Sequence, residues 1–181
     1  MENNDLNRDE MILKQQEDIQ KAIANSTGLV SERFSMAQLE NDFINDTVFK
    51  SKVAKLGERY TAFRKTRPDG NCFFRAVGFR LFELMLEDLD EFSKVKKAIE
   101  GSKDEMVKLG MPEFTVEDFF DNFMDTLEKL SGENKMKLLE LEETFNDEGL
   151  SNYLVVFLRS VLLQLQINRT VTVLFLQAFN K

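Results

Sequence analysis

The feature that most constrains the fold is a long apolar run between Cys72 and Leu89. Few polar residues interrupt it, and its apolar positions are Phe73, Phe74, Ala76, Val77, Phe79, Leu81, Phe82, Leu84, Met85 and Leu86. A helix that is apolar on most sides is a central, buried helix rather than a surface one. The sequence therefore predicts a domain organised around one helix over residues 72–89.

The N-terminal third of the chain predicts shorter and less apolar helices. Asp9 and Glu10 suit the first turn of a helix that Gly28 would end. Its apolar face is narrow, so a loosely docked arm that orders on a partner and a solvated tail are both open alternatives. The spacing of apolar residues between positions 29 and 60, with Phe34 among them, predicts one or two short amphipathic helices.

Amphipathic patterns predict helices in the middle third of the chain, whereas the apolar segment from Tyr153 to Phe179 is broken by polar residues such as Arg159 and Gln164. Amphipathic stretches at 92–109, 115–130 and 135–145 indicate helices, the second of which would begin at Thr115. Residues 170–175 are rich in β-branched and aromatic side chains, which indicates a strand or an adhesive end without a partner strand. The middle third is therefore helical.

Charge and cysteine content limit the partners and the compartment. The 181 residues suffice for one domain with a short extension, and 24 Lys+Arg against 32 Asp+Glu give a net charge of -8. Negative charge repels phosphate backbones and anionic lipids, so neither nucleic acid nor a membrane is expected as a partner. A single cysteine and the lack of a secretion signal in residues 1–18 predict a reducing compartment, the cytoplasm and also the nucleus.

The sequence contains 17 Phe and no His. Histidine is the commonest general base and the commonest metal ligand. Neither Cys-His catalysis nor a Cys/His zinc site can be completed from these residues. We therefore expect no metal and no other cofactor, and any thiol chemistry would lack an imidazole partner.

One turn motif, Asp69-Gly70-Asn71, runs directly into Cys72. Gly70 can adopt a positive φ, and Asn71 or Asp69 can cap the following helix. Cys72 would then lie in the first helical turn, where free N–H groups and the helix dipole favour a thiolate and could hold an oxyanion. The alternative is that a lone cysteine is simply a small buried hydrophobe, and this feature alone does not decide between the two.

The motif at residues 69–76, Asp-Gly-Asn-Cys-Phe-Phe-Arg-Ala, resembles the nucleophile signature of the ovarian-tumour (OTU) family of cysteine deubiquitinases. The preceding Arg-Lys-Thr-Arg-Pro, residues 64–68, is similar to the otubain branch of that family. Other segments that resemble animal otubains are 29–33, 113–119 and 151–156. The resemblance extends from residue 9 to residue 159.

This resemblance implies an α/β, papain-like OTU fold and hydrolysis of the isopeptide bond after the last glycine of ubiquitin. It makes Cys72 the nucleophile, places Asp69 with the active site, and makes Gly70 and Asn71 the oxyanion loop. It also implies binding of ubiquitin, polyubiquitin and a ubiquitin-conjugating enzyme, with the N-terminal arm as part of the contact surface.

The sequence departs from the family at its C-terminal end. The resemblance divides it into a helical arm (1–28), the N-terminal part of an OTU domain with its helical insert (29–160) and a divergent apolar tail (161–181). The family's catalytic histidine and most of its central sheet would follow, so the expected fold is C-terminally truncated and predominantly helical. Missing acid-base help slows each step by roughly a hundred- to ten-thousandfold. We expect either an otubain-type hydrolase with negligible turnover or a non-catalytic binder of ubiquitin and conjugating enzymes.

Overall fold

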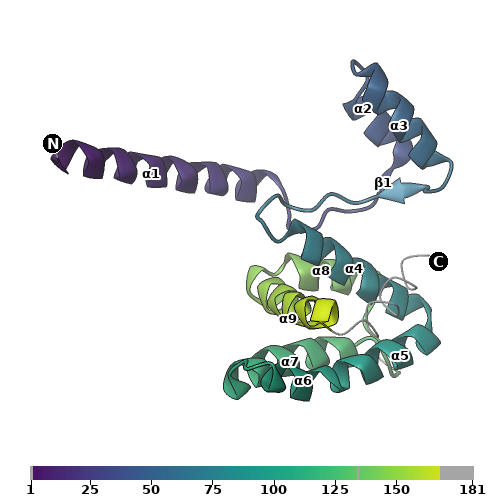
Figure 1. The fold of residues 1–181 in the computed structure, drawn as a ribbon. Coiled ribbons are helices and arrows are strands. Elements are labelled where there is room, and N and C mark those ends of the chain that lie inside the picture. Colours follow the sequence, from purple (N-terminus) through teal and green to yellow (C-terminus); the bar gives the residue numbers. More distant parts are fainter. Residues whose placement is uncertain (1, 134, 168–181) are drawn as a thin grey trace. The chain divides into compact units, whose positions relative to one another are not determined.

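The computed structural model describes residues 2–133 and 135–167 of the chain (Figure 1). The chain divides into two compact units, and the boundary between them lies at Pro68 and Asp69. The three segments expected from the family resemblance stay a prediction, because compact units reflect contacts within the fold and do not mark where a family resemblance begins.

The first unit combines three helices with a small antiparallel sheet. Its elements are α1 (Glu2–Ser26), β1 (Phe34–Ser35), α2 (Met36–Asp42), α3 (Thr47–Gly57) and β2 (Ala62–Phe63). The two strands pair Phe34 with Phe63 and Ser35 with Ala62, and the Phe34 and Phe63 ring centroids lie 5.7 Å apart. The prediction that Phe34 belongs to a helix was wrong, because its backbone pairs with a strand about thirty residues later, a contact that local spacing does not reveal. The prediction of one or two short helices in residues 29–60 is confirmed by α2 and α3.

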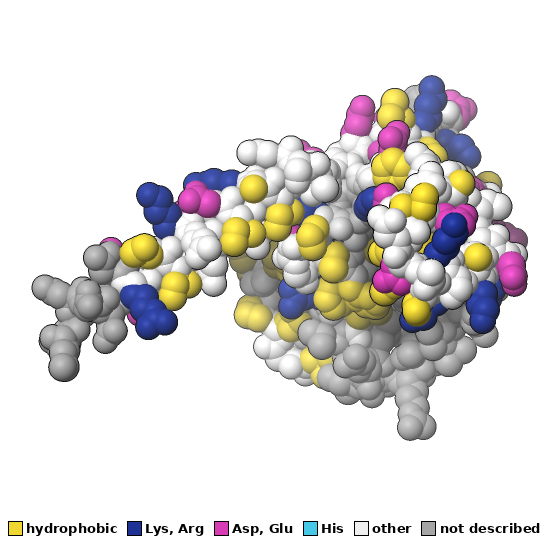
Figure 2. Space-filling view, turned by 90° about the horizontal axis from the view of Figure 1, so that it is seen from above, with side chains coloured by type: hydrophobic (Ala, Val, Ile, Leu, Met, Phe, Trp, Pro, Cys, Tyr) yellow, Lys and Arg dark blue, Asp and Glu magenta, His cyan; other side chains and the backbone are white. Residues whose placement is uncertain are grey.

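Helix α1 begins at Glu2, so the expected start near Asp9 and Glu10 was wrong, and the helix ends at Ser26, just before Gly28. Its described side chains from Arg8 onward are exposed except for Ile23, which is half-buried. Figure 2 shows apolar side chains interspersed with charged ones along this helix. Without a buried face, the apolar pattern could not fix where the helix begins.

The second unit is a helical bundle. Its helices are α4 (Cys72–Glu87), α5 (Leu89–Glu100), α6 (Ser102–Lys108), α7 (Glu113–Glu128), α8 (Leu138–Asn146) and α9 (Glu148–Ile167). Helix α4 packs against α5, α8 and α9, and α9 lies between α4 and α7 (Figure 1). The helices expected at 92–109, 115–130 and 135–145 are confirmed, with the first divided into α5 and α6 at Gly101.

Two details of the bundle differ from the sequence predictions. Helix α7 begins at Glu113 rather than Thr115, because Pro112 ends the preceding loop and its carbonyl already accepts the Val116 N–H at 3.0 Å. Helix α9 was not predicted, because its polar residues appeared to interrupt an apolar tail. The strand expected at 170–175 lies outside the described residues.

Helix α4 is central, as predicted, but it is not covered on every side. Phe82 and Met85 are fully buried, whereas Phe73 is 63% exposed. The buried side meets a cluster of aromatic rings, in which Phe82 and Phe123 lie 5.2 Å apart and Phe123 and Phe157 lie 4.6 Å apart. Much of the unusual phenylalanine content therefore builds the core of the bundle.

Gly78 allows α4 and α9 to approach closely. A Cβ atom at this position would lie 2.5 Å from Leu158 Cδ1 and 3.4 Å from Phe145 Cε1. Leu158 and Phe145 are both fully buried, so a side chain at position 78 would have to displace residues of the core. The absence of a side chain at Gly78 thus sets the distance between the helix that begins at Cys72 and the helix that covers it.

Candidate active site

The turn before α4 has the conformation that its glycine predicts. Gly70 has φ 81°, a left-handed conformation that side-chain-bearing residues rarely adopt. Asp69 Oδ1 accepts the Asn71 backbone N–H at 2.9 Å, which closes a turn of the kind that aspartate favours. The Asp69 side chain therefore holds the turn directly before the thiol.

Cys72 is the first residue of α4, as predicted, and its side chain is half-buried. The first intrahelical hydrogen bond runs from the Arg75 N–H to the Asn71 carbonyl at 2.9 Å, so the N–H groups of Cys72, Phe73 and Phe74 precede it. The alternative that Cys72 is sealed within the core is not supported by this exposure. Cys72 is therefore partly exposed beside a helix end that offers hydrogen-bond donors.

The expected side-chain cap of α4 is absent. Asn71 is the N-cap residue, but its side chain accepts no hydrogen bond from the first turn, and Asp69 bonds to Asn71 rather than to the helix. The Asn71 backbone has φ -106° and ψ -1°, whereas a capping residue is ordinarily extended. The prediction that Asn71 or Asp69 caps this helix was wrong.

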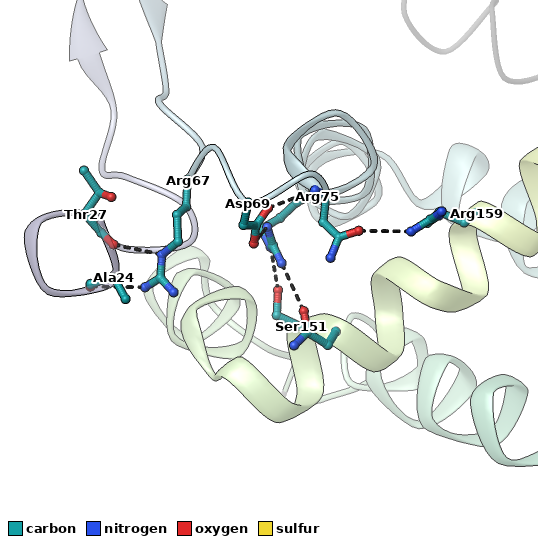
Figure 3. A network of polar contacts seen from close by, with 9 residues as sticks. Ala24, Thr27, Arg67, Asp69, Arg75, Ser151 and Arg159 are labelled. Atoms are coloured by element: carbon teal, nitrogen blue, oxygen red, sulfur yellow. Dashed lines mark hydrogen bonds and ion pairs between the residues drawn. The ribbon is translucent and has the colours of Figure 1, made fainter. Parts of the chain in front are cut away.

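A fully buried arginine connects the turn to α9 (Figure 3). The Arg75 guanidinium donates to Asp69 Oδ2 at 2.7 Å, to Ser151 Oγ at 3.0 Å and to Asn152 Oδ1 at 3.1 Å. Arginine suits this position because its planar group presents five donors in fixed directions. One side chain therefore fixes the turn to a helix about eighty residues later in the sequence.

A second arginine reaches the same turn from α9. Arg159 donates to Asn71 Oδ1 at 3.3 Å (Figure 3), and its guanidinium lies over the Phe74 ring, 5.3 Å from the centroid. Arg159 is exposed, and Phe74 is half-buried. The Asn71 side chain is thus engaged by α9 instead of by the helix that it precedes.

The first unit has a comparable arginine anchor of its own. Arg67 Nε donates to the Thr27 carbonyl at 3.1 Å, and Arg67 Nη2 donates to the Ala24 carbonyl at 3.4 Å, at the end of α1 (Figure 3). Cationic donors at a helix C-terminus satisfy carbonyls that have no intrahelical partner. The basic side chain of Arg67, two residues before Asp69, therefore stabilises the C-terminal end of α1.

The structure brings the predicted residues Asp69, Gly70, Asn71 and Cys72 together, and their roles in a reaction stay a prediction. Sequence reasoning assigned no role to Arg75, Ser151, Asn152 or Arg159. A charged residue inside an otherwise apolar helix was the one available signal for Arg75, because a buried charge requires partners. Nothing in the sequence identified the partners on α9.

Within residues 2–133 and 135–167, no group of three or more cysteine or acidic side chains is arranged to hold a metal ion. None of the helices in that same part of the chain is long and apolar enough to cross a bilayer.

A half-buried thiol at the head of a central helix, behind a braced glycine turn, is the arrangement expected for the nucleophile of a cysteine hydrolase. The family model described as Peptidase C65 Otubain matches residues 22–171, and the chain belongs to the otubain family. The expected family and fold are therefore confirmed.

Relatives with curated descriptions agree with this assignment. Ubiquitin thioesterase OTUB1 of Homo sapiens is 42% identical over 152 residues, which cover 83% of this chain and 55% of the relative. An otubain-like ubiquitin thioesterase of Caenorhabditis elegans is 36% identical over 162 residues, covering 84% of this chain and 55% of the relative. The chain spans about half the length of the curated relatives that it matches.

A solved structure shows the same fold. It is described as "The structure of h/ceOTUB1-ubiquitin aldehyde-UBC13~Ub" and matches with a TM-score of 0.80 and 34% identity. The match covers 88% of this chain and 63% of that one.

Proposed function

We propose that this chain supplies the nucleophile side of an otubain-type cysteine deubiquitinase, with Cys72 as the nucleophile. The observation that carries the proposal is the position of Cys72 as the first residue of α4, directly after a turn with a positive-φ glycine, in a member of the otubain family. Asp69 shapes the turn, and Gly70 and Asn71 form the oxyanion loop.

The reaction that this geometry supports begins at the carbonyl carbon of the last ubiquitin residue. The Cys72 thiolate forms a C–S bond to that carbon, and first-turn N–H groups of α4 hold the oxygen as it becomes negative. The bond to the lysine Nζ then breaks, which leaves a thioester and releases the amine once it gains a proton. Water must attack the thioester to complete a turnover.

The two proton transfers of this reaction have no histidine to carry them out. The 181 residues contain no histidine, so no imidazole of this chain can protonate the leaving amine or activate the water. We expect acylation to be slow and the thioester to accumulate, with negligible turnover by the chain alone.

The second candidate function is non-catalytic binding of ubiquitin, polyubiquitin and a ubiquitin-conjugating enzyme. The relative in the solved complex is described together with ubiquitin aldehyde and a UBC13–ubiquitin conjugate. In this chain, α1 exposes apolar side chains suited to a protein partner, with Met11 68%, Leu13 60% and Ile19 51% exposed. Binding through such a helix requires neither a base nor an intact thiol.

We propose the cytoplasm, and also the nucleus, as the site of action.

A ubiquitin probe with a C-terminal electrophile separates the two functions. Wild-type chain should gain one ubiquitin at Cys72, measured by intact-mass and peptide mass spectrometry, and Cys72→Ala should gain none while binding ubiquitin equally well. Binding without labelling would support the binder alone, and the absence of both would reject both candidates. Robust cleavage of diubiquitin by the pure chain would contradict the expected lack of turnover.

A further inference from the structure

We propose that one face of α3 is a docking surface for an acidic protein segment that also carries apolar side chains. This face, the basic-apolar face, combines three cations with three apolar side chains: Lys52, Lys55 and Arg59 with Val48, Phe49 and Leu56. The proposed reaction uses none of these residues, so the inference goes beyond the proposed function.

The apolar side chains of the α2–α3 hairpin are left largely uncovered. Helices α2 and α3 pack against each other (Figure 1), yet within residues 36–57, all of which the structure describes, Val53 is the one buried side chain. Val48, Phe49 and Leu56 are 59%, 47% and 46% exposed. Neighbouring exposed apolar side chains, when polar groups surround them, are typical of a contact surface for another molecule.

The spacing of the six residues places them on one side of the helix. Residues three and four positions apart are neighbours on a helix surface. One row follows these intervals along the helix: Val48, Lys52, Lys55 and Arg59. Phe49 and Leu56 lie two turns apart in the adjacent row. Glu58 keeps helical dihedral angles, with φ -68° and ψ -25°, so the first row continues past the end of α3.

The cations of this face are not paired with acidic groups of the chain. Within residues 2–133 and 135–167, Lys52, Lys55 and Arg59 have no carboxylate partner. Lys50, on the side of α3 that faces α2, is in contrast paired with Glu40 at 3.6 Å. The Lys52 ammonium lies over the Phe49 ring, 5.4 Å from its centroid, so charge and apolar surface are presented together.

The charge of α3 is opposite to that of the whole chain. The helix contains three lysines and no acidic residue, whereas the chain has a net charge of -8. A local cationic face on an anionic protein attracts acidic groups and orients them, because complementary charges guide association and fix its register. A segment with carboxylates beside apolar side chains would satisfy both components of the face.

The same features favour a protein segment over a bilayer. Helices that lie in a membrane interface gain their affinity from a large apolar area together with attraction to anionic lipids. Only three apolar side chains are presented here, on a helix of 11 residues. The net charge of -8 opposes approach to an anionic lipid surface, but it does not oppose one acidic segment that reaches a local cationic face.

A synthetic acidic peptide tests this surface. The probe is a fluorescein-labelled helical peptide of about four turns, with Glu and Asp on one side and Leu and Phe on the adjacent side. Fluorescence anisotropy should show saturable binding to the full chain with a Kd on the order of 10 µM, as expected for a small interface. A peptide with Lys in place of Glu and Asp should bind at least about tenfold more weakly.

Variants of exposed residues locate the binding site on α3. Lys52→Gln combined with Lys55→Gln should weaken peptide binding about tenfold and reduce its dependence on salt, whereas Lys50→Gln should change it less than about twofold. Leu56→Ser should weaken binding about fivefold, and Leu139→Ser, at a leucine of α8 that is 66% exposed, should leave it unchanged. Far-UV circular dichroism should show that every variant keeps the wild-type helix content.

Four results would overturn the proposal. The first is no saturable binding of the acidic peptide by wild type, and the second is a loss in Lys50→Gln as large as that in the double variant. The third is binding to vesicles of phosphatidylcholine and phosphatidylserine that the double variant abolishes, which would assign the face to a bilayer. The fourth is a wild-type dimer in sedimentation velocity that Leu56→Ser dissociates, which would assign it to a second copy of the chain. None of these measurements depends on Cys72, so failure of the proposed function and failure of this docking surface are distinguishable.

Discussion

Replacement of Arg75 by methionine tests the anchor between the nucleophile turn and α9. Methionine keeps the apolar stem and much of the volume of arginine but removes the guanidinium. It deletes three hydrogen bonds at 2.7, 3.0 and 3.1 Å from a side chain that is fully buried. The packing term is therefore small, and the measured loss reports on the polar contacts.

The size of the loss depends on how far each abandoned partner can reach water. Ser151 is fully buried, so its hydroxyl stays unsatisfied at a cost of about 1 to 3 kcal/mol. The Asp69 side chain is 19% exposed and Asn152 is exposed, so both regain some hydration. Breaking a fully buried ion pair costs about 3 to 5 kcal/mol, and the partial exposure of Asp69 lowers the expected total to about 2 to 4 kcal/mol.

Urea unfolding followed by far-UV circular dichroism measures this loss. Lys108→Met is the matched control, because it deletes an ion pair with Glu105 at 2.9 Å that is exposed to water and screened by it, so its loss should leave the free energy of unfolding almost unchanged. Arg75→Lys should lose less than Arg75→Met, since it keeps the charge beside Asp69 but not the three directions of donation. A loss for Arg75→Met no larger than that of the control would refute the reasoning.

Three further outcomes follow from the packing and from one surface ion pair. Gly78→Ala should destabilise the chain by about 1 to 3 kcal/mol through overpacking, measured in the same urea assay. Gly57→Ala is its control and should be neutral or slightly stabilising, because the new Cβ would meet no atom closer than 4.0 Å. Phe123→Ala should cost about 3 to 5 kcal/mol, and a loss below about 2 kcal/mol would show that the aromatic core is looser than described. The hydrogen bond to Glu117 raises the pKa of Lys103 above 10.5. The stabilisation from this pair is therefore complete below pH 10.5 and is lost as the pH rises through the folded-state pKa of Lys103. In Glu117→Gln, NMR titration should show the pKa of Lys103 falling back toward 10.5.

The sequence predicted the elements whose signal is local. The run from Cys72 predicted α4, and its glycine turn predicted the start of that helix, because an apolar stretch and a positive-φ residue act through neighbouring positions. The helices that became α5 to α8 were predicted from amphipathic spacing in the same way. The predicted helix ends were wrong by a few residues. Helix α7, for example, begins directly after Pro112 and not at Thr115, although threonine favours a helix start.

Contacts between distant residues could not be predicted in this way. The pairing of Phe34 with Phe63 and the hydrogen bonds from Arg75 to α9 join segments whose partners no periodicity identifies. Helix α9 itself was missed because polar residues such as Arg159 interrupt the apolar pattern of the tail, and Arg159 donates from this helix to Asn71. One residue that appeared to break the apolar pattern, Arg159, therefore connects this helix to the turn before Cys72.

The order in which the chain is synthesised gives the Arg75 anchor a further meaning. On the ribosome, Asp69 to Cys72 emerge long before Ser151 and Asn152, so a nascent chain holds the turn without the side chains that complete its anchor. Only after α9 has left the exit tunnel can Arg75 bury its charge. The turn before the thiol therefore gains its partners on α9 only after that helix has been synthesised, so a shorter nascent chain presents Cys72 on a less firmly held turn.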